Sequence, residues 1–154
     1  MTDERLRLEL LVGSLAPHGS TTEQEALVER LETFEHAGTA DVTVQVWGRR
    51  VCPEGPTART AAGRFALDRL AAFRAWAAAT DRSLEPFFRT EHHRSALGGE
   101  SYPAVALPSV ALAEFSGDDL VFLTPHVVGG RPVSVSERLD ALEGDGRPPD
   151  LVAP

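Results

Sequence analysis

The stretch LPSVALAEFSGDDLVFLTPHVVGG, residues 107–130, decides the fold. An apolar run at residues 110–113 precedes the sequence SGDD, and a second apolar segment follows at residues 120–128. Two such segments joined by a short loop rich in Gly and Asp are typical of a β-hairpin. Because the first run is apolar at every position, both of its faces should be covered, which predicts a strand at the centre of a sheet.

A short helix is expected after this hairpin. Ser134 and Glu137 have the spacing of a capping box, in which each side chain bonds the backbone N–H of the other residue, and Gly144 suits the helix end. The sequence VVGGRP, residues 127–132, is expected to connect the strand to this helix. It has too few glycines and no lysine to hold a phosphate.

The N-terminal part of the chain predicts a strand, a helix and a second strand. Residues 5–12 alternate between leucine and charged side chains, which indicates a half-buried strand. Ser20 and Glu23 form a second capping box, and the helix that they open should end near Gly38. Residues 41–47 alternate again, so the two strands should be parallel, as in a βαβ unit.

An alanine-rich helix is expected over residues 58–80. Its apolar positions recur with helical spacing, and they predict a buried side made of Ala66, Leu70, Phe73, Trp76 and Ala77. Residues 87–94 suggest an extended segment, and residues 102–107 suggest a strand that either pairs back with it or leads onward.

The element order is therefore β-α-β-α-β-β-α, which predicts an α/β fold with a mixed sheet. Thioredoxin-like folds use this order, and a ferredoxin-like α+β sandwich is the alternative, because one open sheet face would explain the alternation in the first two strands. We expect a single domain over residues 1–144 and a mobile, Pro-rich tail over residues 145–154.

The chain is acidic and lacks lysine. Asp and Glu number 23 against 15 Arg, which gives a net charge of −8. Such a surface fits a cytoplasm at molar salt, although the codon bias of a GC-rich genome is an alternative explanation. Acidity usually counts against nucleic-acid binding, but at molar salt the Debye length falls to about 3 Å, so net charge then discriminates poorly.

The sequence carries no catalytic motif. Cys52 is the only cysteine and no CxxC is present, which excludes dithiol chemistry within one chain. No Ser-His-Asp spacing, Walker loop, GxGxxG or nucleophile elbow occurs either, so neither an enzyme nor a cofactor is expected. No apolar run approaches the roughly 20 residues that span a bilayer, and the charged N-terminus is unlike a signal peptide, which favours a cytoplasmic protein without membrane contact.

Two candidate sites follow from side-chain chemistry. Arg49, Arg50, Arg59 and Arg64 form the one basic cluster, which suits phosphates or an acidic partner, whereas Arg30, Arg69 and Arg74 lie among acids and suggest solvated helix faces. His and carboxylate side chains could also converge on a metal if their segments pair: Glu91, His92, His93, Glu100 and His126. Because adjacent histidines of a strand point to opposite faces, surface histidines are favoured and no metal is expected.

Parts of the chain, residues 6–48 and 108–144, resemble the thioredoxin-like superfamily in topology. The resemblance places the sequence APHGST at the active-site turn and Pro108 at the position of the superfamily's cis-proline. His18, Ser20 and Thr21 then stand where the thiols would be, so the resemblance implies a scaffold without redox function. These three residues with Pro108 form a candidate site for an anion or another ligand.

Nearly the whole chain resembles a family of small haloarchaeal proteins. The shared motifs appear here as LVERLETF (27–34), FRAWAAAT (73–80), LEPFF (84–88), LPSVALAEF (107–115) and VSERLDALE (135–143). The family carries a helix-turn-helix label, which implies DNA binding. A helix-turn-helix needs two helices joined by a turn of about 3–4 residues. The expected strand at residues 41–47 instead separates the two longest helices.

The sequence therefore supports two hypotheses about function. The first is a non-catalytic interaction or regulatory domain that binds a protein partner. The second is a DNA-binding regulator of the helix-turn-helix type. The polar face expected opposite Leu6, Leu8 and Leu10 could also support a homodimer.

Overall fold

A four-stranded mixed sheet forms the centre of the protein. The computed structural model describes residues 6–13, 22–38, 40–53, 56–94 and 101–145. The strand order is β2-β1-β6-β7, and the strands are β1 (Leu6–Val12), β2 (Ala40–Val46), β6 (Val110–Ser116) and β7 (Asp119–Thr124). β1 and β2 are parallel, whereas β6 is antiparallel to both β1 and β7. The predicted α/β class, mixed sheet and hairpin are confirmed.

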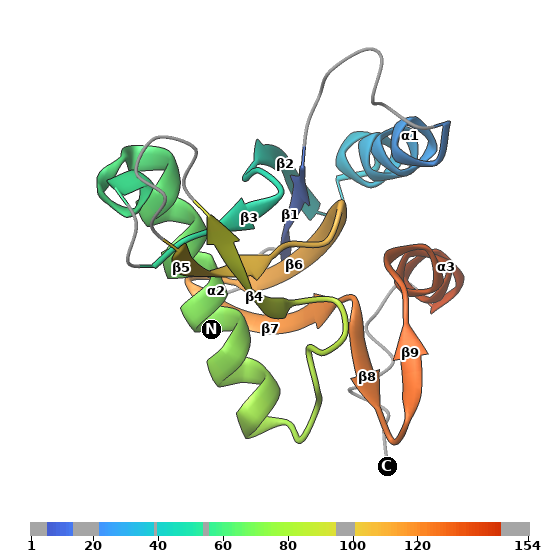
Figure 1. Cartoon of the computed structure of the whole chain (residues 1–154). Coiled ribbons are helices and arrows are strands. Elements are labelled where there is room, and N and C mark those ends of the chain that lie inside the picture. Colours follow the sequence, from blue (N-terminus) through green and yellow to red (C-terminus); the bar gives the residue numbers. More distant parts are fainter. Residues whose placement is uncertain (1–5, 14–21, 39, 54–55, 95–100, 146–154) are drawn as a thin grey trace.

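Helices cover both faces of this sheet (Figure 1). α1 (Thr22–His36) and α3 (Val135–Asp145) lie on one face, and α2 (Ala61–Ala79) lies on the other. Alternate residues of β6 point to the two helix layers. Leu112 packs with α1 and α3, whereas Ala111 and Ala113 pack with α2. The open sheet face of the ferredoxin-like alternative is therefore not found.

β1 is a central strand that is buried on both faces, not a half-buried one. Its second half, including the Glu9 side chain, has almost no exposed surface. The alternation of apolar and charged residues suggested a half-buried strand, because a buried, paired charge and a solvated charge give the same alternation in the sequence. The face opposite Leu8 and Leu10 is covered by α2, so it is not open to a homodimer contact.

α2 has the buried side that its sequence predicts: Ala66, Leu70, Phe73, Trp76 and Ala77. It begins three residues later than expected, at Ala61, because residues Pro56–Arg59 form a separate 3-10 turn, η1. The Thr60 hydroxyl caps the helix by accepting a hydrogen bond from the Gly63 backbone N–H at 3.0 Å.

A second sheet, in the order β3-β5-β4, extends the layer over α2. Its strands are β3 (Arg50–Val51), β4 (Arg89–Arg94) and β5 (Ser101–Ala106), so residues 102–107 pair back with the extended segment. Trp47, Phe73 and Phe88 meet edge to face between α2 and this sheet, with ring centroids 5.8–6.2 Å apart.

The segment after β7 differs from the prediction. Residues 120–128 form two strands, and β8 (His126–Val128) pairs with β9 (Arg131–Val133) instead of with the main sheet. Gly129 and Gly130 both have positive φ, 58° and 77°, which a two-residue hairpin turn requires. The sequence VVGGRP is thus a hairpin, and α3 begins only after it.

The ends of the helices agree only in part with the sequence. The Ser134–Glu137 capping box is confirmed, with reciprocal bonds of 3.1 and 3.2 Å. α3 passes through Gly144 and ends at Asp145. Asp145, the first residue of the expected 145–154 tail, belongs to α3, whereas the rest of the tail and the Ser20–Glu23 box involve parts of the chain outside the described residues.

Candidate functional site

Only Pro108 of the candidate ligand site can be placed, because His18, Ser20 and Thr21 lie outside the described residues. Pro108 is half-buried between β5 and β6, and the Gly13 backbone N–H donates to the Ser109 carbonyl at 3.0 Å. Pro108 therefore lies beside the end of β1. Within the described chain, the cis peptide bonds precede Pro86 and Pro125, so a cis bond before Pro108 is wrong.

The four arginines of the basic cluster are all exposed and belong to neighbouring elements. Arg50 lies in β3, Arg59 in η1 and Arg64 in α2, and α2 packs against both of the other elements. Arg49 directly precedes β3, and its carbonyl accepts a hydrogen bond from the Leu107 N–H. These positions leave a cationic surface near the start of α2.

The histidines do not form a metal site in the described chain. His126 is fully buried, its Nδ1 donates to the Leu123 carbonyl at 2.6 Å, and its Nε2 accepts from Arg82 Nε at 3.3 Å. Both ring nitrogens are thus engaged within the protein. No group of three His, Cys, Asp or Glu that could hold a metal occurs among the described residues, and Glu100 and the side chains of His92 and His93 lie outside them.

A buried ion pair joins α3 to the central strand β6. The Arg138 guanidinium donates to both Glu114 carboxylate oxygens, at 2.6 and 2.8 Å, and the two side chains are 1% and 0% exposed. The guanidinium also lies 3.7 Å from the centroid of the Phe122 ring. Sequence reasoning missed this pair, although one acid inside the apolar run VALAEF was a usable signal.

A second ion pair of this kind joins α2 to β1. Arg69 Nε and Nη2 donate to Glu9 at 2.6 and 2.9 Å, and Glu9 is 2% exposed. The hydrogen bonds to Glu9 raise the pKa of Arg69 above its ordinary value. The expectation that Arg69 lies on a solvated helix face is wrong, because its guanidinium is the charge that compensates a buried carboxylate.

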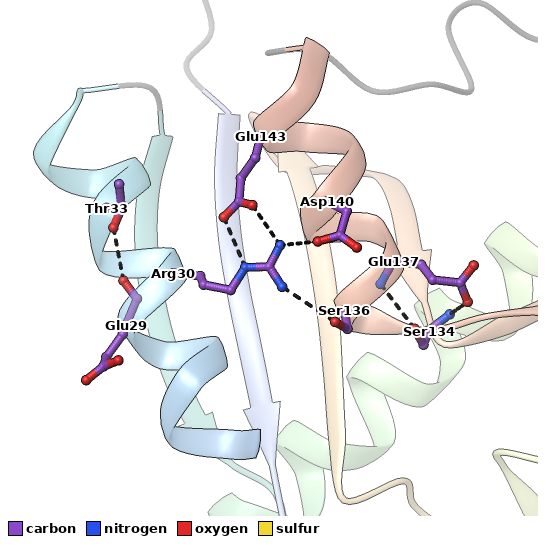
Figure 2. A network of polar contacts seen from close by, with 8 residues as sticks. All are labelled: Glu29, Arg30, Thr33, Ser134, Ser136, Glu137, Asp140 and Glu143. Atoms are coloured by element: carbon purple, nitrogen blue, oxygen red, sulfur yellow. Dashed lines mark hydrogen bonds and ion pairs between the residues drawn. The ribbon is translucent and has the colours of Figure 1, made fainter. Parts of the chain in front are cut away.

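Arg30 links α1 to α3 (Figure 2). Its guanidinium donates to Glu143 at 3.0 and 2.8 Å, to Asp140 at 2.6 Å and to Ser136 at 3.5 Å. The hydrogen bond to Glu143 is the main cause that raises the pKa of Arg30. Arg30 therefore does not lie on a solvated helix face, because it connects the two helices that cover one side of the sheet.

Replacing Arg30 with glutamine should lower the free energy of unfolding only slightly, by about 1 kcal/mol or less, because Asp140 and Glu143 are exposed. Urea denaturation at several salt concentrations measures this effect, and the loss should shrink as salt increases. Arg64→Gln removes an exposed arginine with no ion pair among the described residues and is the matched control. Equal losses for the two variants would contradict the role given to the Arg30 network.

The two edge strands of the main sheet, β2 and β7, differ in how well they are protected against pairing with another strand. On β7, the register shifts opposite Glu114 and Phe115, and the Trp76 indole N–H donates to the Val121 carbonyl at 3.2 Å. On β2, Val44 and Val46 are 39% and 47% exposed, and within the described chain β2 pairs only with β1. A bulge and a hydrogen bond from a side chain hinder pairing along an edge, so we call β7 the blunted edge. A strand with exposed apolar side chains and no such features remains available for pairing.

The described helices do not form a helix-turn-helix pair. β2, β3 and η1 separate α1 from α2, and β4 to β9 separate α2 from α3. The predicted strand at residues 41–47 is therefore confirmed, as β2. None of the described helices is both long and apolar enough to cross a membrane.

Comparison with known proteins identifies a family. No curated protein and no solved structure matches the chain. A family described as a helix-turn-helix domain matches residues 1–147, which is almost the full length of 154 residues. The chain therefore belongs to this helix-turn-helix domain family.

Proposed function

We propose that the protein is a non-catalytic regulatory domain that binds a partner protein by pairing with β2. The observation that carries this proposal is the exposed edge of β2, with Val44 and Val46 both accessible. An extended segment of a partner would continue the sheet through main-chain hydrogen bonds, and apolar side chains at alternate positions would cover the two valines.

The β7 edge is protected against strand pairing and the β2 edge is not, and this difference supports a binding role for the β2 edge. A protein that needed no partner there would be expected to protect both edges, because an unprotected apolar edge promotes aggregation. β7 has such protection through its bulge and through Trp76. β2 has neither lysine nor proline, and its one charged residue is Asp41.

DNA binding is the second candidate function, and family membership favours it. The exposed arginines of the basic cluster, on β3, η1 and α2, are the surface that would contact phosphates: Arg49, Arg50, Arg59 and Arg64. We rank it second because the three described helices are separated by strands and pack on the sheet. Binding would thus use a surface other than a recognition helix.

We also propose that the protein works in a cytoplasm at molar salt, as a member of a haloarchaeal group with a thioredoxin-like scaffold. The net charge of −8 and the absence of lysine support the salt adaptation. The strand order β2-β1-β6-β7, with α1 and α3 on one face and α2 on the other, supports the scaffold.

Replacing both Val44 and Val46 with lysine should abolish partner binding and leave the fold intact, because both side chains are partly exposed. Val121→Lys is the matched control, since Val121 is an exposed valine on the blunted edge. Affinity capture from the native host, with mass spectrometry and circular dichroism of each variant, measures the effect. A partner that the wild type and Val121→Lys retain, and that the double variant loses, supports the proposal.

The same three proteins, together with a variant of the basic cluster, separate the two candidate functions. Fluorescence anisotropy with genomic DNA fragments should show no binding for any of them if the β2 edge is the functional surface. Binding that weakens steeply with salt and is lost in an Arg49→Ala/Arg59→Ala/Arg64→Ala variant would instead favour the DNA-binding function.

A further inference from the structure

A surface cleft of about 320 Å³ is lined by residues of the C-terminal part of α2, of the segment that follows it and of β4. It is remote in sequence from β2 and is not part of the proposed function. Buried apolar side chains line one part of it, namely Ala77, Leu84 and Phe88. Polar side chains line the remainder, and they include Arg74, Arg82 and Thr90.

The two arginines of this cleft differ from the arginines that stabilise the fold. Arg30, Arg69 and Arg138 each bind at least one carboxylate through two hydrogen bonds. Within the described chain, neither Arg74 nor Arg82 forms an ion pair, although Glu85 lines the same cleft. Two guanidinium groups beside an apolar surface are therefore available to an external anion.

Arg82 also connects the cleft to the buried interior. Its Nε donates to His126 Nε2 at 3.3 Å, its Nη1 donates to the Thr80 carbonyl at 3.4 Å, and its guanidinium lies 5.2 Å from the Trp76 ring centroid. Both hydrogen bonds are long and both acceptors are uncharged. An anion would be a stronger acceptor for this guanidinium than either of them.

We infer that this cleft binds a small organic anion, in which a carboxylate or phosphate contacts Arg74 and Arg82 and an apolar group packs on Leu84 and Phe88. The volume is at the lower end of the range of small-molecule sites, which fits a ligand with one ring or a short chain. The hydroxyl of Thr90 adds a donor at the cleft for the anion.

Nuclear magnetic resonance titration with phenyl phosphate tests this inference, at the lowest salt at which the chain is folded. Inorganic phosphate and phenol, the two parts of the probe, are the reference ligands, and benzoate decides between carboxylate and phosphate. Phenyl phosphate or benzoate should shift the Arg82 Nε–H, the His126 ring and the Thr90 amide, since Arg82 donates directly to His126. Each reference ligand should bind more weakly.

Three single variants test both the direction and the size of the expected changes in binding affinity. Arg74→Gln, at an exposed position, should weaken binding by at least about tenfold. Glu85→Gln should tighten it, because it removes a negative charge from the cleft. Arg64→Gln, on the same helix but outside the cleft, should leave binding unchanged.

The inference is overturned if neither anionic probe shifts the cleft resonances, or if phenol binds as tightly as they do. It is also overturned if Arg74→Gln and Arg64→Gln weaken binding equally, since that result would indicate non-specific attraction to positive charge. Because none of these variants alters β2, failure here leaves the proposed function untouched.

Discussion

Replacing Arg138 with methionine is expected to lower the free energy of unfolding by about 3–5 kcal/mol. The variant removes the guanidinium that donates two hydrogen bonds to Glu114, and it leaves that carboxylate fully buried beside Phe122. A buried carboxylate that loses a bidentate guanidinium is no longer compensated for its removal from water. Urea denaturation followed by circular dichroism measures the loss as a shift of the midpoint.

The double variant Glu114→Leu/Arg138→Met is the control for this prediction. It should recover most of the lost stability, because replacing both members of a buried ion pair with apolar side chains of similar volume is often neutral or stabilising. If the single and double variants were equally unstable, the loss would come from altered packing around α3, and not from the loss of the Arg138 guanidinium beside Glu114.

Replacing Phe73 with alanine should also cost about 3–5 kcal/mol. Phe73 is fully buried on α2, and its ring contacts both Trp47 and Phe88 edge to face. The substitution therefore removes apolar burial and aromatic contacts, and it leaves a cavity between α2 and the β3-β5-β4 sheet. Denaturation measures the loss, and the near-ultraviolet dichroism of Trp47 should weaken because its neighbouring ring is absent.

Phe65→Ala is the matched control on the same helix. Phe65 is only partly buried, so its loss should cost clearly less than that of Phe73. A Phe73 variant no less stable than the Phe65 variant would show that the aromatic cluster is not a main contributor to the core.

The layers of the fold could be predicted from local patterns. The helical spacing of apolar residues in α2 identified its buried side, and the continuous apolar run of β6 identified a strand covered on both faces. These patterns work because each element buries the face that its own sequence makes apolar. The hairpin of β8 and β9 was missed, because periodicity alone could not show that residues 120–128 break into two strands.

The charged contacts between the elements could not be predicted in the same way. Glu9 and Arg69 are 60 residues apart in sequence, Glu114 and Arg138 are 24 apart, and Arg30 and Glu143 are 113 apart. A period of two in a strand, or one charge per turn in a helix, is compatible with either a solvated or a paired charge. Only the packing of the elements brings these partners together.

The family description rests on a sequence match, whereas a helix-turn-helix is a particular arrangement of helices. Membership follows from a match over residues 1–147, whereas a helix-turn-helix requires two consecutive helices. In this protein β2 lies between α1 and α2 and forms one edge of the main sheet. Experiments on function should therefore begin with the sheet edge and the basic cluster, and not with an assumed recognition helix.

The three arginine contacts described above also fix the alignment of the layers. One joins α2 to β1, one joins α3 to β6, and one joins α1 to α3. A helix that slid by one turn of about 5.4 Å would move its guanidinium away from the carboxylate that it binds, so each planar fork fixes the position of its helix. These contacts therefore specify the position of each helix, even where, as for Arg30, they add little to stability.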